Sequence, residues 1–430
     1  MSRLLIKHGR VVDPTQRLDE GLWVLIADGK VARLAERIED RDAEVFDATG
    51  LVVAPGFVDV HTHLREPGFE YKETIATGSA AAVAGGFTAV CSMPNTQPVN
   101  DNAAVTEFIR GRAAAAGLAR VYPIGAVSKG LQGDELAEMG EMARAGAVAF
   151  SDDGKPVHNA YLMRRALEYA QLFDVPVVDH CEDPNLAAKG VMHEGAVATR
   201  LGLRGIPAAA EEVMVARDVV LAGLTGGRLH VAHVSTSGAL DRVREGKAKG
   251  VAVTCEVTPH HLALTDQAVA DSEYDTDTKV NPPLRSADHV AALVQGVLDG
   301  AVDCLATDHA PHHADEKVLE FDLAPFGVVG LETAVPVTYD LLVRRHKLPL
   351  RMFIALWSSN PVRVFGLPGG SLKVGSPADI TLLDLEARLT VNPDRFRSLS
   401  RNTPFAGQRL KGWPAATLVG GKAVWRRERR

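Results

Sequence analysis

Residues 51–60 read LVVAPGFVDV and lead directly into HTH at 61–63. This stretch is the first of eight short apolar runs, rich in valine and alanine, that alternate with helical patterns along the chain. The other seven runs are 87–93, 120–127, 147–150, 175–179, 228–234, 251–257 and 302–307. Continuously apolar strands that alternate with helices are typical of a parallel sheet covered on both faces. Eight such units predict an α/β fold with a (β/α)8 TIM-like barrel rather than an open sheet.

The two chain ends have a different pattern. Residues 1–54 and 366–430 contain short strand-like runs with glycine at hairpin turns, as in ADGK (27–30) and VGGKAV (419–424). Neither end is long enough to make an adequate core alone. We therefore expect the two ends to pair into one small β-sandwich domain, beside a metal-dependent catalytic barrel that spans residues 55–365.

Composition excludes several classes of protein. Hydrophobic residues make up 46% and charged residues 23% of the 430, which is ordinary for a globular chain. The net charge of −7 argues against a nucleic-acid-binding surface. The N-terminus lacks a signal-peptide pattern, and no uncharged apolar run reaches the roughly 18 residues that span a membrane. We expect a cytoplasmic enzyme with a small-molecule substrate, four free cysteines, and no nucleic-acid or membrane partner.

Polar side chains stand where several of the apolar runs end. In a barrel of this type the chemistry lies at the carboxyl ends of the strands. A surface or capping role is the more common explanation for any one such residue, but it does not explain the whole set on one rim. The set is His61, His63, Asn95, Asp152, Asp153, His180, His233 and Asp308.

The spacing of the histidines points to metal binding. Residues i and i+2 of a strand face the same side, so His61 and His63 both face the barrel interior, where neutral imidazoles can hold a divalent metal. His230 and His233 are three apart and face opposite sides, so only His233, at the strand end, suits a ligand. Four histidines and two aspartates exceed the needs of one zinc ion. They suggest two metals that share a carboxylate and a hydroxide.

Seven motifs, in this order along the chain, together resemble the dihydroorotases of the amidohydrolase superfamily. They are PGFVDVHTHLREPG (55–68), MPNTQP (93–98), FSDDG (150–154), DHCED (179–183), HVAHVST (230–236), KVNPPLR (279–285) and TDHAPHH (307–313). The chain is most similar to the bacterial type in which an aspartate bridges the metals. The resemblance implies the reversible cyclisation of N-carbamoyl-L-aspartate to L-dihydroorotate, with loss of water, in pyrimidine (UMP) biosynthesis.

The resemblance also implies a role for each residue of the metal site. His61, His63 and Asp308 match the ligands of one zinc ion, and His180 and His233 match those of a second. Asp153, the aspartate directly before the glycine, matches the residue that bridges the two ions together with a hydroxide. Asp308 doubles as the general acid and base, which passes a proton from the hydroxide to the departing ring nitrogen.

Substrate recognition requires cations and amides, because carbamoyl aspartate is an anion. Arg65 lies two residues beyond His63 and can form a bidentate pair with the α-carboxylate. The resemblance adds Asn95 and His312 as partners of that carboxylate, and Asn281 and the backbone of 326–327 as contacts of the ring amide. The full expected set is His63, Leu64, Arg65, Asn95, Asn281, His312, Phe326 and Gly327. The long charged stretch 312–327 is a candidate active-site lid.

Two alternatives stay open at this point. A hydantoinase or allantoinase resembles this chain at HTH but usually carries a lysine on the fourth strand, where this chain has SDDG (151–154). A non-catalytic scaffold for aspartate transcarbamoylase typically loses metal histidines, and all four are present here. For the enzyme itself we expect a homodimer, with association with aspartate transcarbamoylase as a further possibility.

Overall fold

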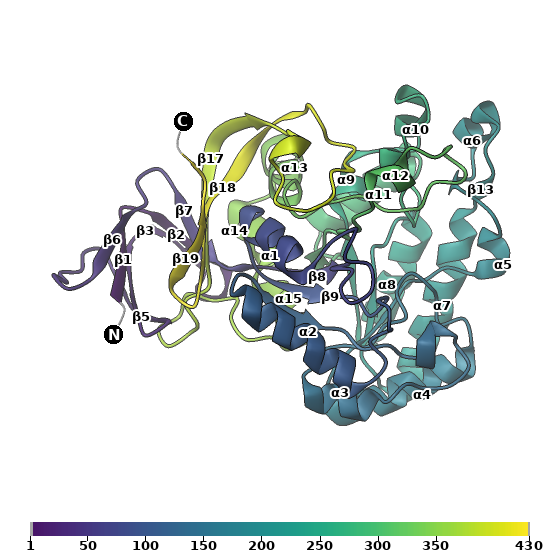
Figure 1. The fold of residues 1–430 in the computed structure, drawn as a ribbon, viewed down its shortest axis with the longest axis horizontal. Helices are drawn as coiled ribbons and strands as arrows, with labels where there is room; N and C mark the ends of the chain where they lie inside the picture. Colours follow the sequence, from purple (N-terminus) through teal and green to yellow (C-terminus); the bar gives the residue numbers. More distant parts are fainter. Residues whose placement is uncertain (1–2, 429–430) are drawn as a thin grey trace.

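The computed structural model describes residues 3–428 and divides into a β-rich lobe and a larger lobe of strands and helices (Figure 1). Strands from the beginning and the end of the chain, purple and yellow in the figure, lie together in the β-rich lobe. Residues 1–2 and 429–430, which the sequence assigns to the composite domain, lie outside the described part. No helix within residues 3–428 combines the length and apolar character needed to cross a bilayer.

The β-rich lobe contains two sheets. The order of the four-stranded sheet is β5–β4–β1–β6, and that of the six-stranded sheet is β19–β18–β17–β7–β2–β3. β7 pairs antiparallel with β17, which places Pro55 opposite Ile380, so the second sheet is built from both ends of the chain. The strands are β1 (Arg3–Lys7), β2 (Arg10–Asp13), β3 (Leu18–Gly21), β4 (Trp23–Ala27), β5 (Lys30–Ala35), β6 (Glu44–Asp47), β7 (Val52–Pro55), β17 (Ile380–Thr390), β18 (Arg409–Val419) and β19 (Lys422–Arg426).

The larger lobe contains two parallel sheets. β8, β9 and β10 form one, and β11, β14, β15 and β16 form the other. Isolated parallel bridges join Gly125 to Phe150 and Phe150 to Val177, and another joins Thr62 of β8 to His309, which lies beyond β16. The strands are β8 (Phe57–Thr62), β9 (Phe87–Ser92), β10 (Arg120–Pro123), β11 (Val177–Asp179), β14 (Leu229–Val231), β15 (Val253–Val257) and β16 (Cys304–Leu305), with a separate pair β12 (Met192–His193) and β13 (Gly205–Ile206).

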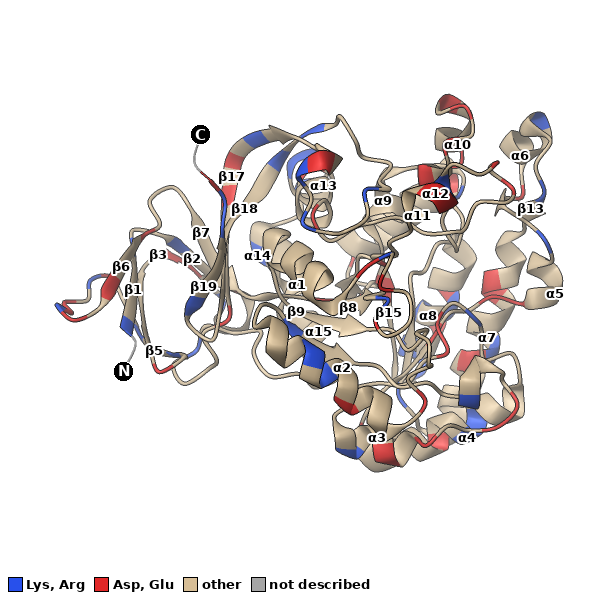
Figure 2. Ribbon diagram, in the orientation of Figure 1, with Lys and Arg blue, Asp and Glu red and all other residues tan. Residues whose placement is uncertain are grey.

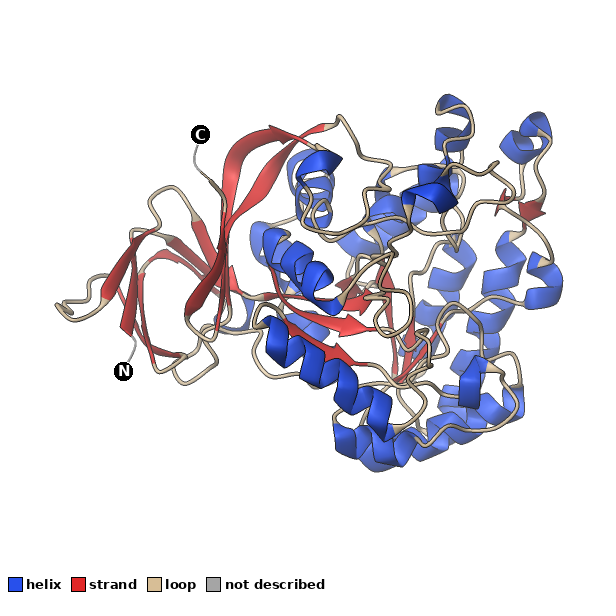
Figure 3. Ribbon diagram, viewed as in Figure 1, coloured by secondary structure: helices blue, strands red, loops and turns tan. Residues whose placement is uncertain are grey.

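Helices surround these parallel strands (Figure 3). Figure 2 shows acidic and basic residues interspersed along the outer helices, α3 and α4 among them, as expected for a solvated surface. The helices are α1 (Ile75–Ala84), α2 (Ala103–Ala116), α3 (Met139–Ala145), α4 (Ala160–Ala170), α5 (Pro184–Ala187), α6 (Ala196–Leu201), α7 (Ala208–Thr225), α8 (Ser237–Ala248), α9 (Pro259–Ala263), α10 (Gln267–Asp271), α11 (Ala287–Leu298), α12 (Ala314–Lys317), α13 (Ala334–Thr338), α14 (Leu350–Trp357) and α15 (Ser359–Phe365).

The strands are buried on both faces. Phe57 and Val90 belong to the cluster that packs against the helices, whereas their chain neighbours Val58 and Ala89 belong to a separate inner cluster. This alternation follows from the period of two in a strand. It explains why the runs read as continuously apolar. The four cysteines are buried free thiols.

Two of the apolar runs do not form single strands as predicted. The run at 51–60 is divided, because β7 joins the six-stranded sheet and β8 begins only at Phe57. Gly56 stands between them, and a Cβ atom there would lie 2.2 Å from Thr88 Oγ1, so the turn requires glycine. The run at 147–150 forms single bridges at Phe150 instead of a ladder.

Candidate metal centre

The expected metal ligands converge at the carboxyl ends of the parallel strands. His61 is the fifth residue of β8, and His63 follows that strand. The other ligands come directly after a strand or bridge, in the segments that follow Phe150, β11, β14 and β16. Each residue is buried, and the largest exposed fraction, at Asp308, is 6%. The complete set is His61, His63, Asp153, His180, His233 and Asp308.

Asp153 lies among the four histidines. Its Oδ1 atom is 3.3 Å from His61 Nε2, 3.4 Å from His233 Nε2 and 3.8 Å from His180 Nδ1. Its Oδ2 atom is 3.4 Å from His63 Nε2. Asp153 therefore contacts both expected pairs of ligands, His61 with His63 and His180 with His233, as a bridging carboxylate would.

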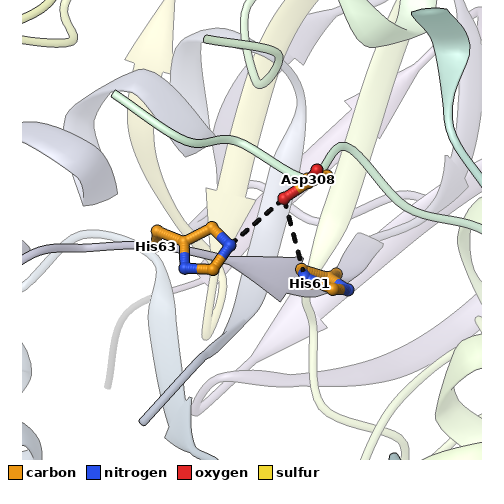
Figure 4. Close-up of side chains that lie close together, drawn as sticks. All are labelled: His61, His63 and Asp308. Carbon is orange, nitrogen blue, oxygen red and sulfur yellow. Dashed lines mark hydrogen bonds and ion pairs between the residues drawn. The ribbon is translucent and has the colours of Figure 1, made fainter. Parts of the chain in front are cut away.

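Asp308 completes one side of the cluster (Figure 4). Its Oδ1 atom lies 3.1 Å from His63 Nε2 and 3.6 Å from His61 Nε2. Asp308 and His233 have φ angles of +47° and +31°, values that non-glycine residues rarely adopt. Such strain costs about 1–3 kcal/mol per residue and is typical of functional sites.

Several polar side-chain atoms of these residues are buried without a satisfied hydrogen bond. Within residues 3–428 they include His61 Nε2, Asp153 Oδ1 and His233 Nδ1. Ligand atoms of His61, His63 and Asp308 lie within 4.8 Å of one another, as do those of His61, Asp153 and His233. Because unsatisfied buried polar atoms are costly, and because imidazole and carboxylate are ordinary ligands of divalent metals, the residues fit a metal centre.

The electrostatics of the cluster favour the ionised form of its two aspartates. Burial would raise the pKa of Asp153, but His61, His233 and His63 outweigh it and hold this pKa well below its usual value. Burial likewise opposes ionisation of Asp308, and the neighbouring histidines lower its pKa. Burial, together with His233, lowers the pKa of His180, which leaves this imidazole neutral and able to ligate.

Glu256 is a buried carboxylate that contacts the expected metal ligand His61. This residue of β15 is fully buried, and its carboxylate lies 2.6 Å from His61 Nδ1 and 3.1 Å from His230 Nε2. It also accepts a hydrogen bond of 3.3 Å from the backbone N–H of His233. Burial would raise the pKa of Glu256, but His61 and His230 lower it to about 2. Sequence reasoning missed Glu256, although the single charged residue of β15 was an available signal.

Asp152 and Asp153 point in different directions. Asp152 accepts backbone hydrogen bonds of 2.9 Å from Val127 and Ser128, and another from the Ser128 hydroxyl. Despite these bonds, burial raises the pKa of Asp152 to about 6. Asp152 therefore holds the loop after β10, while Asp153 alone faces the histidines.

The expected substrate-binding side chains lie around the same cluster. Asn95 Oδ1 is 2.9 Å from His63 Nδ1. Arg65 Nε donates to the Pro311 carbonyl at 3.2 Å, and its Nη2 atom lies 3.5 Å from His312 Nε2. These contacts place one cation and two polar groups on one side of the metal centre.

Asn281 lies on the other side, with its Nδ2 atom 3.4 Å from His180 Nε2. Its Oδ1 atom is buried and has no hydrogen-bond partner among residues 3–428. The Leu64 side chain is buried in the hydrophobic core, so only its backbone is available to a ligand. His312 Nε2 donates to the Phe326 carbonyl at 2.8 Å. Gly327 donates its N–H to the Lys279 carbonyl at 2.9 Å and accepts from Asn402 at 3.0 Å, so both its backbone groups are engaged.

Comparison with known proteins identifies the family of the chain. The family model described as Dihydro-orotase-like matches residues 50–239. A dihydroorotase of Anaeromyxobacter dehalogenans is 60% identical over 98% of this chain and 97% of its own length. A dihydroorotase of Pelotomaculum thermopropionicum is 57% identical over 98% of each chain. The solved structure of an L-hydantoinase (dihydropyrimidinase) from Arthrobacter aurescens matches with a TM-score of 0.87 and 27% identity, over 98% of this chain and 96% of that one. The α/β amidohydrolase-type fold is thereby confirmed, and the chain belongs to the dihydroorotase family.

Proposed function

We propose that this chain is a dihydroorotase, which interconverts N-carbamoyl-L-aspartate and L-dihydroorotate plus water in pyrimidine biosynthesis. One observation carries the proposal: Asp153 lies between four imidazoles, and the Arg65 cation lies close enough to interact electrostatically with Asp308 and Asp153. A carboxylate-bearing substrate requires such a cation next to the reacting centre. The identity of 60% to a dihydroorotase over nearly the full length supports this substrate class.

In this proposal the centre holds two zinc ions. His61, His63 and Asp308 would hold one, His180 and His233 the other, and Asp153 would bridge them. When bound, such ions lower the pKa of a water and polarise the carbonyl under attack. Imidazole and carboxylate ligands suit zinc, which is also preferred over manganese and cobalt in the general affinity order.

Asp308 is the proton carrier of the proposed reaction. Its lowered pKa keeps it ionised, so it can accept a proton from the attacking water in the ring-opening direction. The same carboxylate then delivers the proton to the departing ring nitrogen. In the synthetic direction it removes a proton from the carbamoyl nitrogen as the ring closes.

The surrounding residues orient the substrate. Arg65, Asn95 and His312 bind the α-carboxylate. Asn281 offers its free Oδ1 atom to a ring N–H, and the backbone at Phe326 contacts the ring amide. Because these groups are fixed before the substrate arrives, the reaction gains from orientation.

We also infer that the strands of the larger lobe close into a (β/α)8 barrel at residues 55–365. The parallel bridges from Gly125 to Phe150, from Phe150 to Val177 and from Thr62 to His309 support this closure. Residues 1–54 and 366–430 would form the β-sandwich domain, which is supported by one apolar cluster that contains residues of both sheets. We further propose that the chain forms a homodimer and associates with aspartate transcarbamoylase. Sedimentation of the protein with and without the transcarbamoylase tests both proposals.

Hydantoinase activity is the second candidate, because a solved L-hydantoinase shares the fold. A cyclisation assay on metal-analysed protein separates the two activities. With zinc present, we expect dihydroorotate to form from carbamoyl aspartate and expect no opening of hydantoin or dihydrouracil. Zinc-loaded protein that opens hydantoin but forms no dihydroorotate would overturn the proposal.

A further inference from the structure

Two lysines hold the backbone of residues 322–327, which ends at the proposed substrate site. Lys279 is 2% exposed, and its ammonium group donates to the carbonyl of Ala324 at 2.6 Å and to that of Asp322 at 3.2 Å. The same ammonium lies 4.7 Å from the centre of the Phe326 ring. Lys279 is part of KVNPPLR, two residues before Asn281.

Lys317 holds the other part of this segment. Its ammonium group donates to the carbonyls of Pro325 at 3.2 Å and Gly327 at 3.1 Å. The backbone carbonyl of Lys317 in turn accepts a hydrogen bond of 2.5 Å from Thr276. The two lysines together therefore bind four of the six carbonyls from 322 to 327.

Lys279 is buried and Lys317 is half-buried, and in the described part of the chain both lack the usual carboxylate partner of a lysine. Within residues 3–428 neither Lys279 nor Lys317 has a carboxylate oxygen within 4.0 Å, in contrast to Lys72 and Lys247. Burial lowers the pKa of Lys279 and of Lys317 to about 8. A buried ammonium that pairs only with carbonyls is costly for the fold, so its presence requires another reason.

The position of the held segment supplies that reason. The Phe326 carbonyl accepts from His312, and the Gly327 N–H donates to the Lys279 carbonyl. Gly327 has a φ angle of +129°, and a Cβ atom there would lie 2.8 Å from the Ala310 Cβ atom. Within residues 3–428 the Phe326 N–H makes no hydrogen bond, so it is available to a ligand.

We propose that Lys279 and Lys317 are positioning residues, which fix the backbone of 322–327 so that the Phe326 N–H and His312 face the substrate. This inference rests on the proposed function for the identity of the substrate. It makes this segment a fixed wall of the site, and it restricts any lid motion of the stretch 312–327 to the residues before 322. Charged hydrogen bonds suit this role because they are shorter and stronger than neutral ones.

Lys279→Met and Lys317→Met test the proposal, because each keeps an apolar stem and loses the donors. Lys373→Met, at an exposed lysine of the other lobe, is the matched control. Hydrogen exchange of peptides that cover 320–328 should be about tenfold faster in each test variant than in the control, since restraint of this backbone is lost. The KM for carbamoyl aspartate should rise about tenfold, with kcat much less affected, because orientation and not the reacting groups has changed. Lys317→Arg keeps a cationic donor, so its exchange rate and its KM should both lie close to the wild-type values.

Exchange and KM equal to those of the control in both Met variants would overturn the proposal. Equal losses of kcat and metal content would also overturn it, because they would indicate a general structural role. If Lys279→Met does not fold, the less buried Lys317→Met and its arginine rescue decide the question. Exchange reports on the backbone without turnover, so failure of the proposed function, seen as an inactive zinc-loaded wild type, remains distinguishable.

Discussion

Replacement of Glu256 by glutamine removes one buried negative charge from beneath the metal centre with almost no change in shape. Glutamine can keep the contact to His61, because its Oε1 atom still accepts from His61 Nδ1–H. Its amide group can donate to His230 Nε2 once that imidazole carries its proton on Nδ1, where the Thr254 hydroxyl lies 2.8 Å away. The variant therefore isolates the effect of charge from that of geometry.

The expected loss follows from the position of Glu256. Its carboxylate orients His61 through Nδ1, at 2.6 Å, and makes the opposite Nε2 atom a stronger ligand. Partners of this kind change metal affinity by about 10- to 100-fold. This corresponds to about 1.4–2.7 kcal/mol of binding free energy. The proton shift in His230 adds a smaller cost of the same sign.

Competition for zinc with a chromophoric chelator measures this loss directly. Glu332→Gln is the control for a carboxyl-to-amide exchange away from the metal centre, because Glu332 accepts backbone hydrogen bonds at Arg397 and Ser398, in a part of the fold that provides no metal ligand. Thermal unfolding of the two apo proteins checks that the variants are folded. A zinc affinity of Glu256→Gln within about twofold of the control would refute the reasoning, because the charge would then not act through His61.

Three further predictions concern single carboxylates. Asp308→Asn should keep its zinc and lose about 100- to 10,000-fold in kcat, because the proton carrier is lost; retained turnover would remove Asp308 from that role. Asp153→Ala should reduce zinc content far more than Asp152→Ala does. Asp152→Ala should instead lower the unfolding free energy by about 2 kcal/mol, because two buried N–H groups lose their acceptor. A larger loss of zinc in Asp152→Ala than in Asp153→Ala would mean that Asp152 is the ligand. Burial raises the pKa of Glu332 from 4.5 to about 8, so the folded state keeps a proton that the unfolded chain releases. The unfolding free energy of the wild type should therefore fall by about 1–3 kcal/mol relative to Glu332→Gln between about pH 5 and pH 8, and parallel pH profiles in denaturant titrations would contradict this.

The sequence identifies the strand ends well because each apolar run stops where a polar side chain begins. The i, i+2 rule places His61 and His63 on one side, and their Nε2 atoms do lie within 3.6 Å of the same Asp308 oxygen. The prediction that His233, and not His230, joins the cluster rests on the same parity. In both cases the information is local, since a strand fixes the direction of its own side chains.

Other features depend on contacts that no local pattern contains. An apolar run does not say which sheet it joins, so the division of 51–60 at Gly56 becomes visible only when Thr88 packs against that glycine. Glu256 reads as an exception within β15 until His61 and His230 lie on either side of it. Lys279 likewise has a role only because its carbonyl partners, about 45 residues later, fold back over it.

The two adjacent aspartates of SDDG show how the local sequence pattern and the tertiary contacts combine. Side by side, the carboxylates would repel each other, yet both are almost fully buried. The structure separates them, because Asp152 turns to the backbone donors at Val127 and Ser128 while Asp153 turns to four imidazoles. Gly154 allows this divergence, since it has a φ angle of +88° and a Cβ atom there would lie 3.0 Å from Asn95 Nδ2. The two aspartates of the motif therefore act together. Asp152 fixes the loop, so that Asp153 can face a metal pair that neutralises its charge.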